Sequence, residues 1–435
     1  METISMSFRE RKRLEVFSRV GLGEMTLVEA SEILRLSYRQ TKRVWSRYKA
    51  TGDTGLVHGG RGRASNRQSS GALKEQALAL YRERYSDYGP TLAAECLSQE
   101  DGLVVRVTTL RRWLVQAGLW ERRRKRRVHR RRRERRTHVG ELVQLDGSHH
   151  DWFEGRRAVA IPDVAYAGWA VLMVMIDDAT GRVFARFYEN ESWHSATDVF
   201  RQYVTRYGLP GGLYVDQHSI YRADREPTSE EILEDERPVT QFGRAMRELD
   251  VELILARSPQ AKGRVERMNG TLQDRLVKAL RRAGICDIGS ANRFLDEQFL
   301  SELNSRFMVS ATSSADHHRA VTSELDLPRV LSIQEERVVQ NDWTVRWQNR
   351  ILQLSRESSD LIQPRHRVTL CEQLDGALRV FVGAEELGWS PIRSEPAAKT
   401  RKVPPGHPTG SNQGQKPRAD HPWRGRRDVR TSPSS

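Results

Sequence analysis

The sequence predicts a multidomain chain with two all-α helix-turn-helix units at the N-terminus, a central α/β domain and a small β-barrel near the C-terminus. Three observations predict this order. Hydrophobic residues recur at helical spacing through much of residues 8–117, whereas strand-like apolar runs alternate with amphipathic helices between residues 140 and 290. Short alternating segments separated by turn residues then fill residues 330–393. A chain of 435 residues also exceeds what one hydrophobic core holds.

Changes in composition set the expected domain boundaries. Residues 53–70 are rich in Gly, Arg and Ser, as linkers are, and residues 395–435 are rich in Pro, Gly, Ser and Arg with little to bury. From start to end we expect a helix-turn-helix domain at 1–52, a linker at 53–70, a second helix-turn-helix domain at 71–120, a basic linker at 121–138, an α/β core at 139–300, a helical connector at 301–329, a small β-barrel at 330–394 and a disordered basic tail at 395–435.

The charge of the chain indicates an anionic partner. The formal net charge is +15 and the pI is about 10.0, a balance typical of proteins that bind nucleic acid. Residues 122–136 alone hold 12 Arg or Lys and one Glu. We expect this run, with Arg130 and Arg131 at its centre, to contact DNA phosphates; a solvated or nuclear-localisation segment is the alternative.

Cysteine usage and hydropathy point to the inside of the cell. Cys96, Cys286 and Cys371 lie far apart, so they predict neither a disulfide framework nor a zinc site. No apolar run reaches the roughly 18 residues that span a bilayer, and the N-terminus lacks the apolar stretch of a signal peptide. We therefore expect no membrane partner and a reducing cytosol.

The first helical unit carries two candidate capping boxes. Thr26 with Glu29, and Ser37 with Gln40, each have the spacing at which a side chain satisfies a free N–H at a helix start. They predict two short helices joined by a tight turn, the pattern of a helix-turn-helix; an ordinary helical hairpin with a solvated basic face is the alternative. The exposed side chains expected to read DNA are Arg39, Gln40, Lys42 and Arg43.

A second unit repeats this layout. The pattern predicts helices at 72–85, 91–97 and 108–117, with Gly118 ending the last one. A helical spacer is the alternative to a second DNA-binding unit. The expected DNA-contacting residues are Thr109, Arg111 and Arg112.

The central region predicts a mixed sheet. Two apolar strands joined by a turn at Asp178–Gly181 follow a first strand at 140–149. Helices and strands then alternate, which is typical of an α/β domain. In order, we expect a helix at 195–207, a strand at 212–217, a helix at 241–249, a strand at 251–256 and a long helix at 264–283.

Three acidic residues stand where a metal site would need them. Asp146 lies within the first strand, Asp216 at the end of a later strand, and Glu266 early in the long helix. Taken singly, each is more often a turn former or a surface charge. Together they could hold Mg²⁺, a hard ion that prefers oxygen ligands. Two such ions, about 3.5–4 Å apart, can activate a nucleophile and stabilise the leaving oxygen of a phosphodiester.

The motifs around these carboxylates carry a family resemblance. Residues 140–285 are similar to the catalytic core shared by retroviral integrases and bacterial insertion-sequence transposases of the DDE type. The segments QLDGSHHDWFEGR, IDDATGRV, YVDQHSIYR and SPQAKGRVERMNGTLQDRL resemble the ISNCY-type transposases, and the similarity extends over residues 10–390. Three departures stand out: residues 223–240 form an acidic insertion between Asp216 and Glu266, and His218 and Gln273 replace residues common in relatives.

The resemblance implies an RNase H-like fold and a function. It implies cutting at the 3′ ends of a mobile element with Mg²⁺, for which Mn²⁺ could substitute, and attack of each 3′-OH on target DNA. Asp146, Asp216 and Glu266 would be both the catalytic residues and the metal ligands. The implied partners are double-stranded DNA, both element ends and target, and a second copy of the chain, since pairing two ends needs at least a homodimer. The implied location is the bacterial cytoplasm, with the nucleoid.

Other residues near these motifs have weaker signals. Lys262, Arg264 and Asn269 open the long helix or share its face, where we expect DNA contacts; a solvated loop lysine is the alternative for Lys262. Simpler readings, as packing, DNA-contacting or turn residues, outweigh metal binding at five further positions: His149, His150, Asp151, Asp177 and Asp178.

Two other functions compete with transposition. A catalytically inactive DNA-binding regulator derived from a transposase would keep the helix-turn-helix units, and a structure-specific nuclease would keep the core. The three carboxylates in the sequence argue against the regulator, and the two helical units argue against the nuclease.

Overall fold

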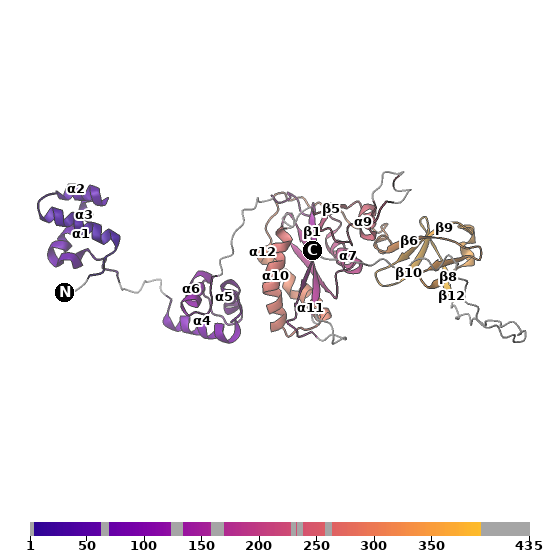
Figure 1. Cartoon of the computed structure of the whole chain (residues 1–435), viewed down its shortest axis with the longest axis horizontal. Helices are drawn as coiled ribbons and strands as arrows, with labels where there is room; N and C mark the ends of the chain where they lie inside the picture. Colours follow the sequence, from indigo (N-terminus) through magenta and orange to yellow (C-terminus); the bar gives the residue numbers. More distant parts are fainter. Residues whose placement is uncertain are drawn as a thin grey trace, which may run out of the picture. The chain divides into compact units, whose positions relative to one another are not determined.

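A computed structural model describes the fold over most of the chain. The described residues are 4–61, 69–122, 134–157, 169–227, 232, 238–256 and 263–392. The chain divides into two compact units, Met1–Arg130 and Arg131–Ser435 (Figure 1). The predicted phosphate contacts Arg130 and Arg131, the loop residue Lys262 and the predicted tail at 395–435 lie outside the described residues.

The first helical region contains the predicted pair of short helices. Its elements are α1 (Phe8–Gly21), α2 (Leu27–Leu34), α3 (Tyr38–Thr51) and the short η1 (Gly52–Leu56). The predicted Thr26–Glu29 capping box is formed, and Arg35 in the left-handed conformation ends α2. Ser37 accepts the N–H of Gln40, but between these two described residues the return bond of the second predicted box is missing. Phe17, Val44 and Leu56 are buried together beneath α1 and α3.

The second helical region also follows the prediction. Its helices are α4 (Gly71–Arg84), α5 (Pro90–Gln99) and α6 (Val107–Gln116). Tyr81, Leu97 and Leu110 are buried in a core shared by all three, and the Tyr81 hydroxyl donates to the carbonyl of Tyr88 at 2.8 Å. Gly118, with a φ of 67°, ends the unit as expected, since glycine adopts this conformation without strain.

The central domain is the predicted mixed sheet. Its five strands have the order β3-β2-β1-β4-β5, with β1, β2 and β3 antiparallel and β4 and β5 parallel to β1. This arrangement agrees with the RNase H-like core that the resemblance implies. The strands are β1 (Val143–His150), β2 (Ala170–Asp177), β3 (Val183–Tyr188), β4 (Gly212–Val215) and β5 (Glu252–Leu255).

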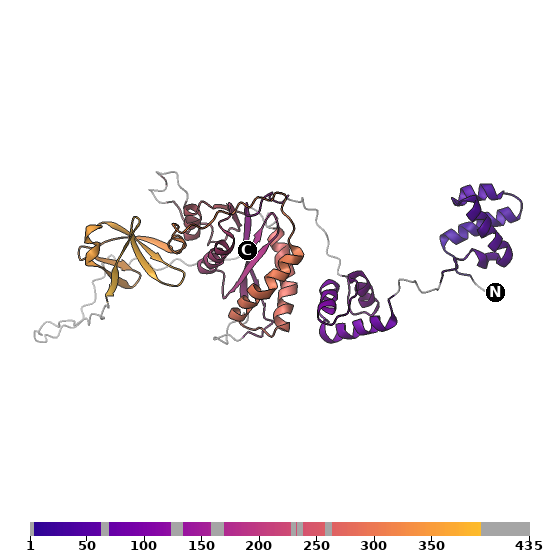
Figure 2. The ribbon, with the colours of Figure 1, turned by 180° about the vertical axis from the view of Figure 1, so that it is seen from behind.

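Helices cover both faces of this sheet. In the views of Figures 1 and 2, β1 lies between α10 (Gly263–Arg282) on one side and α7 (Trp193–Tyr207) on the other. β2 is buried along its whole length, as a central strand covered on both faces must be. The remaining helical elements are α9 (Gln241–Glu248), α11 (Ile288–Phe294), η3 (Leu295–Phe299) and α12 (Leu300–Phe307). None of the described helices combines the length and apolar character needed to cross a membrane.

The segment predicted as a helical connector is helical at its ends alone. α12 stops at Phe307 and α13 (Leu327–Val330) is a single turn. Between them the chain runs along the central domain and bonds to it: the amide of His317 donates to the carbonyl of Val139 at 2.8 Å. These backbone bonds to the domain replace the bonds that a continuous helix would make.

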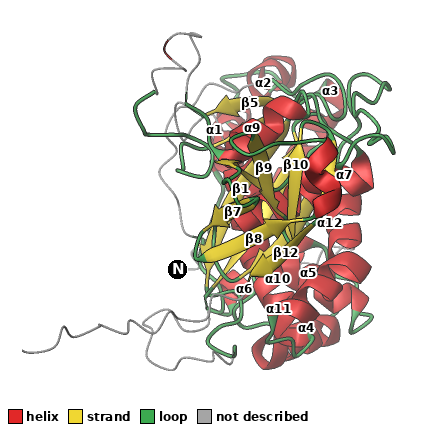
Figure 3. Ribbon diagram, turned by 90° about the vertical axis from the view of Figure 1, so that its right-hand side faces the viewer, coloured by secondary structure: helices red, strands yellow, loops and turns green. Residues whose placement is uncertain are grey.

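The C-terminal strands form two open sheets in place of the predicted closed barrel. Their orders are β11-β10-β9-β6 and β12-β8-β7, drawn in yellow in Figure 3. The chain turns at Trp343, which has a φ of 61°, and within the described residues β6 and β7 do not pair; the sheets instead share a core that includes Val345, Leu352 and Val368. The strands are β6 (Ile333–Val338), β7 (Thr344–Trp347), β8 (Arg350–Leu354), β9 (Arg367–Glu372), β10 (Leu378–Val382), β11 (Glu385–Leu387) and β12 (Trp389–Ile392), with η4 (Arg356–Asp360) between β8 and β9.

Candidate functional site

The pairing of β1 with β4 sets two of the predicted carboxylates side by side. Val143 pairs with Leu213 and Gln144 with Tyr214, in parallel. Continuing this register by two residues places Asp146 next to Asp216, the first residue after β4. Neighbouring strands lie about 4.7–4.9 Å apart, and matched positions in parallel strands project from the same face. Asp146 and Asp216 are each half-buried, so both carboxylates can reach an incoming ligand.

Helix α10 is locked to the same face of β1 by three hydrogen bonds. The amide of Val265 donates to Gln144 Oε1 at 3.4 Å, and Gln273 Nε2 donates to Ser148 Oγ at 3.2 Å. Between them, Asn269 Nδ2 donates to Asp146 Oδ2 at 2.8 Å. Four helix residues rise about 6.0 Å and two strand residues about 6.7 Å, so every second strand residue meets every fourth helix residue. Asn269, which we predicted to contact DNA, is therefore buried, and its side chain is hydrogen-bonded to Asp146.

The third predicted carboxylate, Glu266, lies on α10 but takes no part in these three hydrogen bonds to β1. Glu266 is exposed in the first turn of α10, three residues before Asn269. Within the described residues, no three His, Cys, Asp or Glu side chains lie close enough together to hold a metal ion. The strand register therefore sets Asp146 near Asp216, but the three predicted carboxylates do not form a group of metal ligands in the described part of the chain.

The donor atoms near Asp146 suit a divalent cation. Two carboxylates on adjacent strands offer the oxygen ligands that Mg²⁺ prefers. The Asn269 side-chain oxygen is buried and has no hydrogen-bond partner among the described residues, although its amide nitrogen is committed to Asp146. A buried polar atom left in this way costs free energy unless a ligand satisfies it. These donor atoms are of the kind that an oxygen-coordinated cation takes, although the described residues assemble no group of three acidic, His or Cys ligands.

The paired aspartates of the IDDATG motif have structural partners. Asp177 accepts from the amides of Gly140 at 2.9 Å and Thr180 at 2.8 Å, which closes the turn between β2 and β3. Asp178, fully buried, accepts from Gln144 Nε2 at 2.8 Å and forms an ion pair with Arg264. These contacts favour the turn interpretation over metal binding. They also direct Arg264, a predicted DNA contact, into the protein.

The two histidines and Asp151 that follow Asp146 have contacts away from it. His149 Nε2 bonds to Glu191 Oε2 at 2.9 Å. His150 packs edge-on against Trp152, with ring centroids 5.4 Å apart. Asp151 accepts the amide of Gly155 at 3.0 Å in a turn.

Two residues near the carboxylates were not singled out from the sequence. The Glu191 carboxylate lies against Gly147, where any side chain would collide with it. Tyr221 is buried, and its hydroxyl has no hydrogen-bond partner among the described residues. Burial, followed by the charges of Glu191, Asp216 and Asp146, raises the pKa of Tyr221 well above its usual value. The glycine directly after Asp146 was the available sequence signal, but a glycine alone does not say what fills its space.

The predicted DNA-contacting residues of the helical units are mostly solvent-facing. On α3, a surface groove is lined by Arg39, Gln40, Arg43 and Arg47, and Lys42 is exposed beside it. On α6, Arg111 and Arg112 are exposed, whereas Thr109 is half-buried. The exposed cations are available to a phosphate or base edge.

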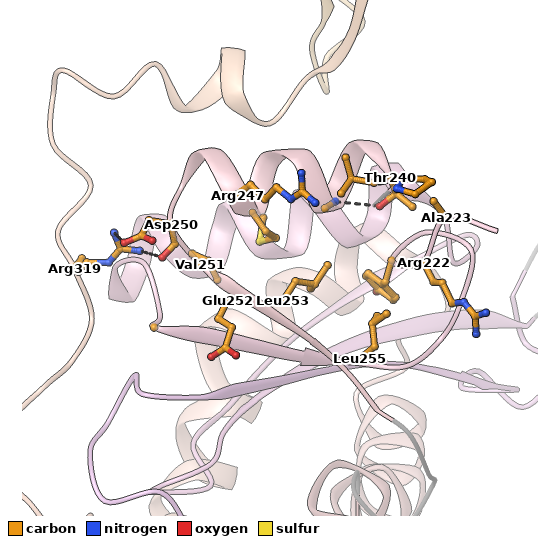
Figure 4. A pocket seen from close by; sticks show the side chains of 16 residues that line it. Arg222, Ala223, Thr240, Arg247, Asp250, Val251, Glu252, Leu253, Leu255 and Arg319 are labelled. Atoms are coloured by element: carbon orange, nitrogen blue, oxygen red, sulfur yellow. Dashed lines mark hydrogen bonds and ion pairs between the residues drawn. The ribbon is translucent and has the colours of Figure 1, made fainter. Parts of the chain in front are cut away.

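A separate pocket lies beside the last strand of the central sheet. It encloses about 940 Å³ between α9 and β5, and Figure 4 shows Arg222, Arg247 and Arg319 around it, with Glu252 and Leu253 on the strand. Its lining does not include Asp146, Asp216 or Glu266. This pocket is thus distinct from the carboxylate site.

Comparison with known proteins finds two relatives whose names both describe a transposase. The chain is 42% identical over 341 residues to a putative transposase, y4bF, of Sinorhizobium fredii, which covers 78% of this chain and 71% of that protein. It is 28% identical over 377 residues to the transposase for insertion sequence IS1202 of Streptococcus pneumoniae, covering 78% of this chain and 77% of the relative. No protein-family model matches the chain.

Solved structures give weaker matches. The HTLV-2 integrase catalytic core domain in complex with magnesium is 17% identical, with a TM-score of 0.24, covering 37% of this chain and 90% of that one. The simian T-cell lymphotropic virus intasome in complex with a PP2A regulatory subunit is 14% identical, with a TM-score of 0.29, covering 73% of this chain and 96% of that one.

The fold and site define a helical N-terminal part followed by an α/β core with two aspartates on its adjacent central strands. The sequence relatives then assign the family. Because the first relative shares 42% identity over 71% of its length, the chain belongs to the transposases.

Proposed function

We propose that this protein is a DNA transposase that binds the terminal repeats of a mobile element, cuts its 3′ ends with Mg²⁺ and transfers them to target DNA. The observation that carries the proposal is the register of β1 and β4, which sets Asp146 beside Asp216. Family membership supports the reaction class, and the Asn269 bond to Asp146 supports the role of this carboxylate.

The proposed chemistry has two phosphoryl-transfer steps. A water oxygen forms a bond to phosphorus while the bond from phosphorus to the 3′ oxygen breaks, which leaves a 3′-OH. That oxygen then attacks a target phosphodiester, and the target's own 3′ oxygen leaves. Asp146, Asp216 and Glu266 would hold Mg²⁺ or Mn²⁺, which when bound neutralises charge on the phosphate and favours an ionised nucleophile. Asn269 keeps the Asp146 carboxylate oriented through its amide.

End recognition is assigned to the helical units. The exposed side chains of α3 and α6 would enter the major groove, as recognition helices do. Arg130, Arg131 and Lys262 would contact phosphates, which position a protein without reading sequence. Pairing two element ends requires a homodimer or larger assembly on double-stranded DNA, working in the bacterial cytoplasm with the nucleoid.

The first test of the proposal is Asp216→Asn. Cleavage of an end-bearing duplex in Mg²⁺ should be abolished, because the substitution removes a charge from the paired carboxylates, while DNA binding should stay within about twofold. Asp224→Asn, an exposed carboxylate of the same loop paired with Arg222, is the matched control and should cut normally. Cutting at the wild-type rate by the Asp216 variant, or by wild type in EDTA, would reject the assignment.

One observation favours a second candidate. Glu266 is exposed, and the described residues contain no group of three carboxylate, His or Cys ligands, as a catalytically inactive DNA-binding regulator would allow. The same assay separates the two functions, since a regulator binds terminal repeats but leaves them uncut at any Mg²⁺ concentration.

A further inference from the structure

The turn between β2 and β3 receives both the segment by which the chain enters the central domain, residues 135–142, and the segment by which it leaves, residues 308–319. In the entry segment, Arg135 Nη1 donates to two carbonyls of the turn, at 3.3 and 3.2 Å. In the exit segment, the amide of Val309 donates to the carbonyl of Thr180 in the same turn at 2.9 Å. Two segments that lie far apart in the sequence therefore dock on one turn.

The entry and exit segments also bond to each other. The amide of Ser313 donates to the carbonyl of Thr137 at 3.0 Å, and the amide of His317 donates to the carbonyl of Val139 at 2.8 Å. The rings of His138 and His317 stack, with centroids 3.9 Å apart and an angle of 16° between their planes. Main chain and side chains thus join the two segments, which together with the turn form what we call the junction.

His318 anchors the exit segment. Its side chain is 3% exposed, and its ring nitrogens bond to Tyr203 Oη at 2.9 Å and to Asp316 Oδ1 at 2.6 Å. Gly140 of the entry segment has a φ of 74°, and a Cβ there would lie 2.4 Å from His318 Nδ1. Since any side chain at position 140 would be strained and would meet the ring, the glycine lets the two segments pack closely.

Asp178 extends the junction to α10. This carboxylate is fully buried, and its Oδ2 accepts the amide of Arg136 in the entry segment at 2.9 Å. Its Oδ1 accepts from Gln144 of β1 at 2.8 Å and pairs with Arg264 at the start of α10. One side chain therefore holds the entry segment against both the strand and the helix that carry predicted carboxylates.

The residue held by Asp178 is also the last of the basic run 122–136, which we propose contacts DNA phosphates. A tether that only raises the local concentration of DNA needs no fixed end, because its benefit depends on length. Reacting groups gain further when their orientation is fixed, and a misplacement of about 1 Å can lower a rate about 100-fold. A fixed end of the basic run therefore points to orientation.

We propose that Asp178 and His317 are positioning residues for DNA cutting: through the junction they hold the end of the basic run in a fixed register with β1 and α10, so that bound DNA is presented to the carboxylate site in one orientation. The inference rests on the proposed function and deepens it. It assigns to these two residues an effect on the cutting rate and none on DNA affinity.

The test compares cutting with binding in the full-length chain. In His317→Ala, the single-turnover rate of cutting an end-bearing duplex, with protein in excess, should fall about tenfold, while the Kd from fluorescence anisotropy should stay at the wild-type value. His317→Phe keeps a flat ring over His138 and should restore most of the rate. His366→Ala is the matched control: this exposed histidine accepts the amide of Gln363 at 3.2 Å within the C-terminal β region, so the variant should cut at the wild-type rate.

Asp178→Asn should lower the cutting rate more, by about 100-fold. An amide side chain has one acceptor oxygen, whereas Asp178 accepts from Arg136 on one oxygen and from Gln144 on the other. Near-ultraviolet circular dichroism sets the temperature at which the variant is folded and the assay is run. If Asp178→Asn does not fold, the pair His317→Ala and His317→Phe decides, because His317 is exposed.

The outcomes separate this inference from the proposed function. Wild-type cutting rates in His317→Ala and Asp178→Asn, with cutting lost in Asp216→Asn, overturn the inference and leave the proposed function standing. A loss of DNA affinity as large as the loss of rate, or a rate that His317→Phe does not restore, also overturns the inference alone. A wild-type chain that does not cut an end-bearing duplex overturns both.

Discussion

Helices α3 and α10 are both amphipathic and rich in basic residues, yet they use their cations differently. On α3, Arg39, Lys42 and Arg43 are exposed, and among the described residues they form no ion pair. On α10, Arg264 pairs with Asp178 and Lys278 with Asp274. The same residue types are therefore left exposed to solvent or complete the fold according to whether the protein already supplies their counter-charge.

The reason for the difference lies in what each helix packs against. α10 covers β1, and the turn after β2 places the fully buried Asp178 beneath its first residues. A buried carboxylate needs a charged partner as well as hydrogen bonds. α3 packs on α1 through Phe17 and Val44, both apolar, so its outer face is left to solvent.

Arg264→Ala should give the largest effect on stability. It removes the Arg264 guanidinium from the buried Asp178 carboxylate, and breaking a buried ion pair costs about 3–5 kcal/mol in the free energy of unfolding. Urea unfolding followed by near-ultraviolet circular dichroism measures this loss. Arg267→Ala, an exposed arginine one turn along α10, should change the free energy by less than about 0.5 kcal/mol. Equal effects of the two substitutions would show that burial does not distinguish these cations.

Replacing Arg39 and Arg43 together by alanine should have the opposite pattern of effects, with DNA recognition changed and stability kept. We expect stability within about 0.5 kcal/mol of wild type, whereas the ratio of terminal-repeat to random-duplex affinity should fall, since each lost bidentate base contact costs about 1–3 kcal/mol. Arg19→Ala on α1, whose side chain pairs with Glu24 at 3.5 Å, is the control. Titration of both duplexes by fluorescence anisotropy measures the ratio; an unchanged ratio would remove α3 from sequence reading.

Periodicity and caps predicted most of the elements because these signals are local. β1, α7 and α10 begin and end within a few residues of their predicted bounds, and the Thr26–Glu29 box formed as its spacing requires. Such features depend on residues within one turn of each other.

The sequence could not predict contacts between distant segments. Asn269 bonds to Asp146 across 123 positions, and Glu191 fills the space over Gly147 from another loop. The closure of the C-terminal strands into a barrel was predicted wrongly for a related reason: the alternation of β6 and β7 is visible in the sequence, but whether they pair depends on the turn between them.

Replacing Glu10 should have the smallest effect on stability, because its cationic partner Arg61 is largely exposed to solvent, whereas the partner of Asp178 is mostly buried. The Glu10 side chain is 5% exposed and its partner Arg61 is 42% exposed. Hydrogen bonds from the amides of Ser7 and His58 and from the Ser7 hydroxyl, helped by the charge of Arg61, lower the Glu10 pKa from 4.5 to about 2. A carboxylate with a lowered folded-state pKa stabilises the fold above its unfolded pKa, and this contribution is lost as the pH falls through the folded value. Protection of the α1 amides should therefore decline between about pH 4.5 and 2.

Hydrogen exchange of the full-length chain, corrected for the intrinsic pH dependence of exchange, measures this decline peptide by peptide. In Glu10→Gln the protection of α1 at pH 5 should already be reduced, and its further change toward pH 3 should be smaller than in wild type, because the titrating group is gone. Glu15→Gln, an exposed glutamate on the same helix, should follow wild type. A wild-type pH profile in Glu10→Gln would mean that the inward carboxylate of α1 contributes no pH-dependent stability. In that case α1, the helix on which α3 packs, would not gain stability from a paired inward charge as α10 is expected to do.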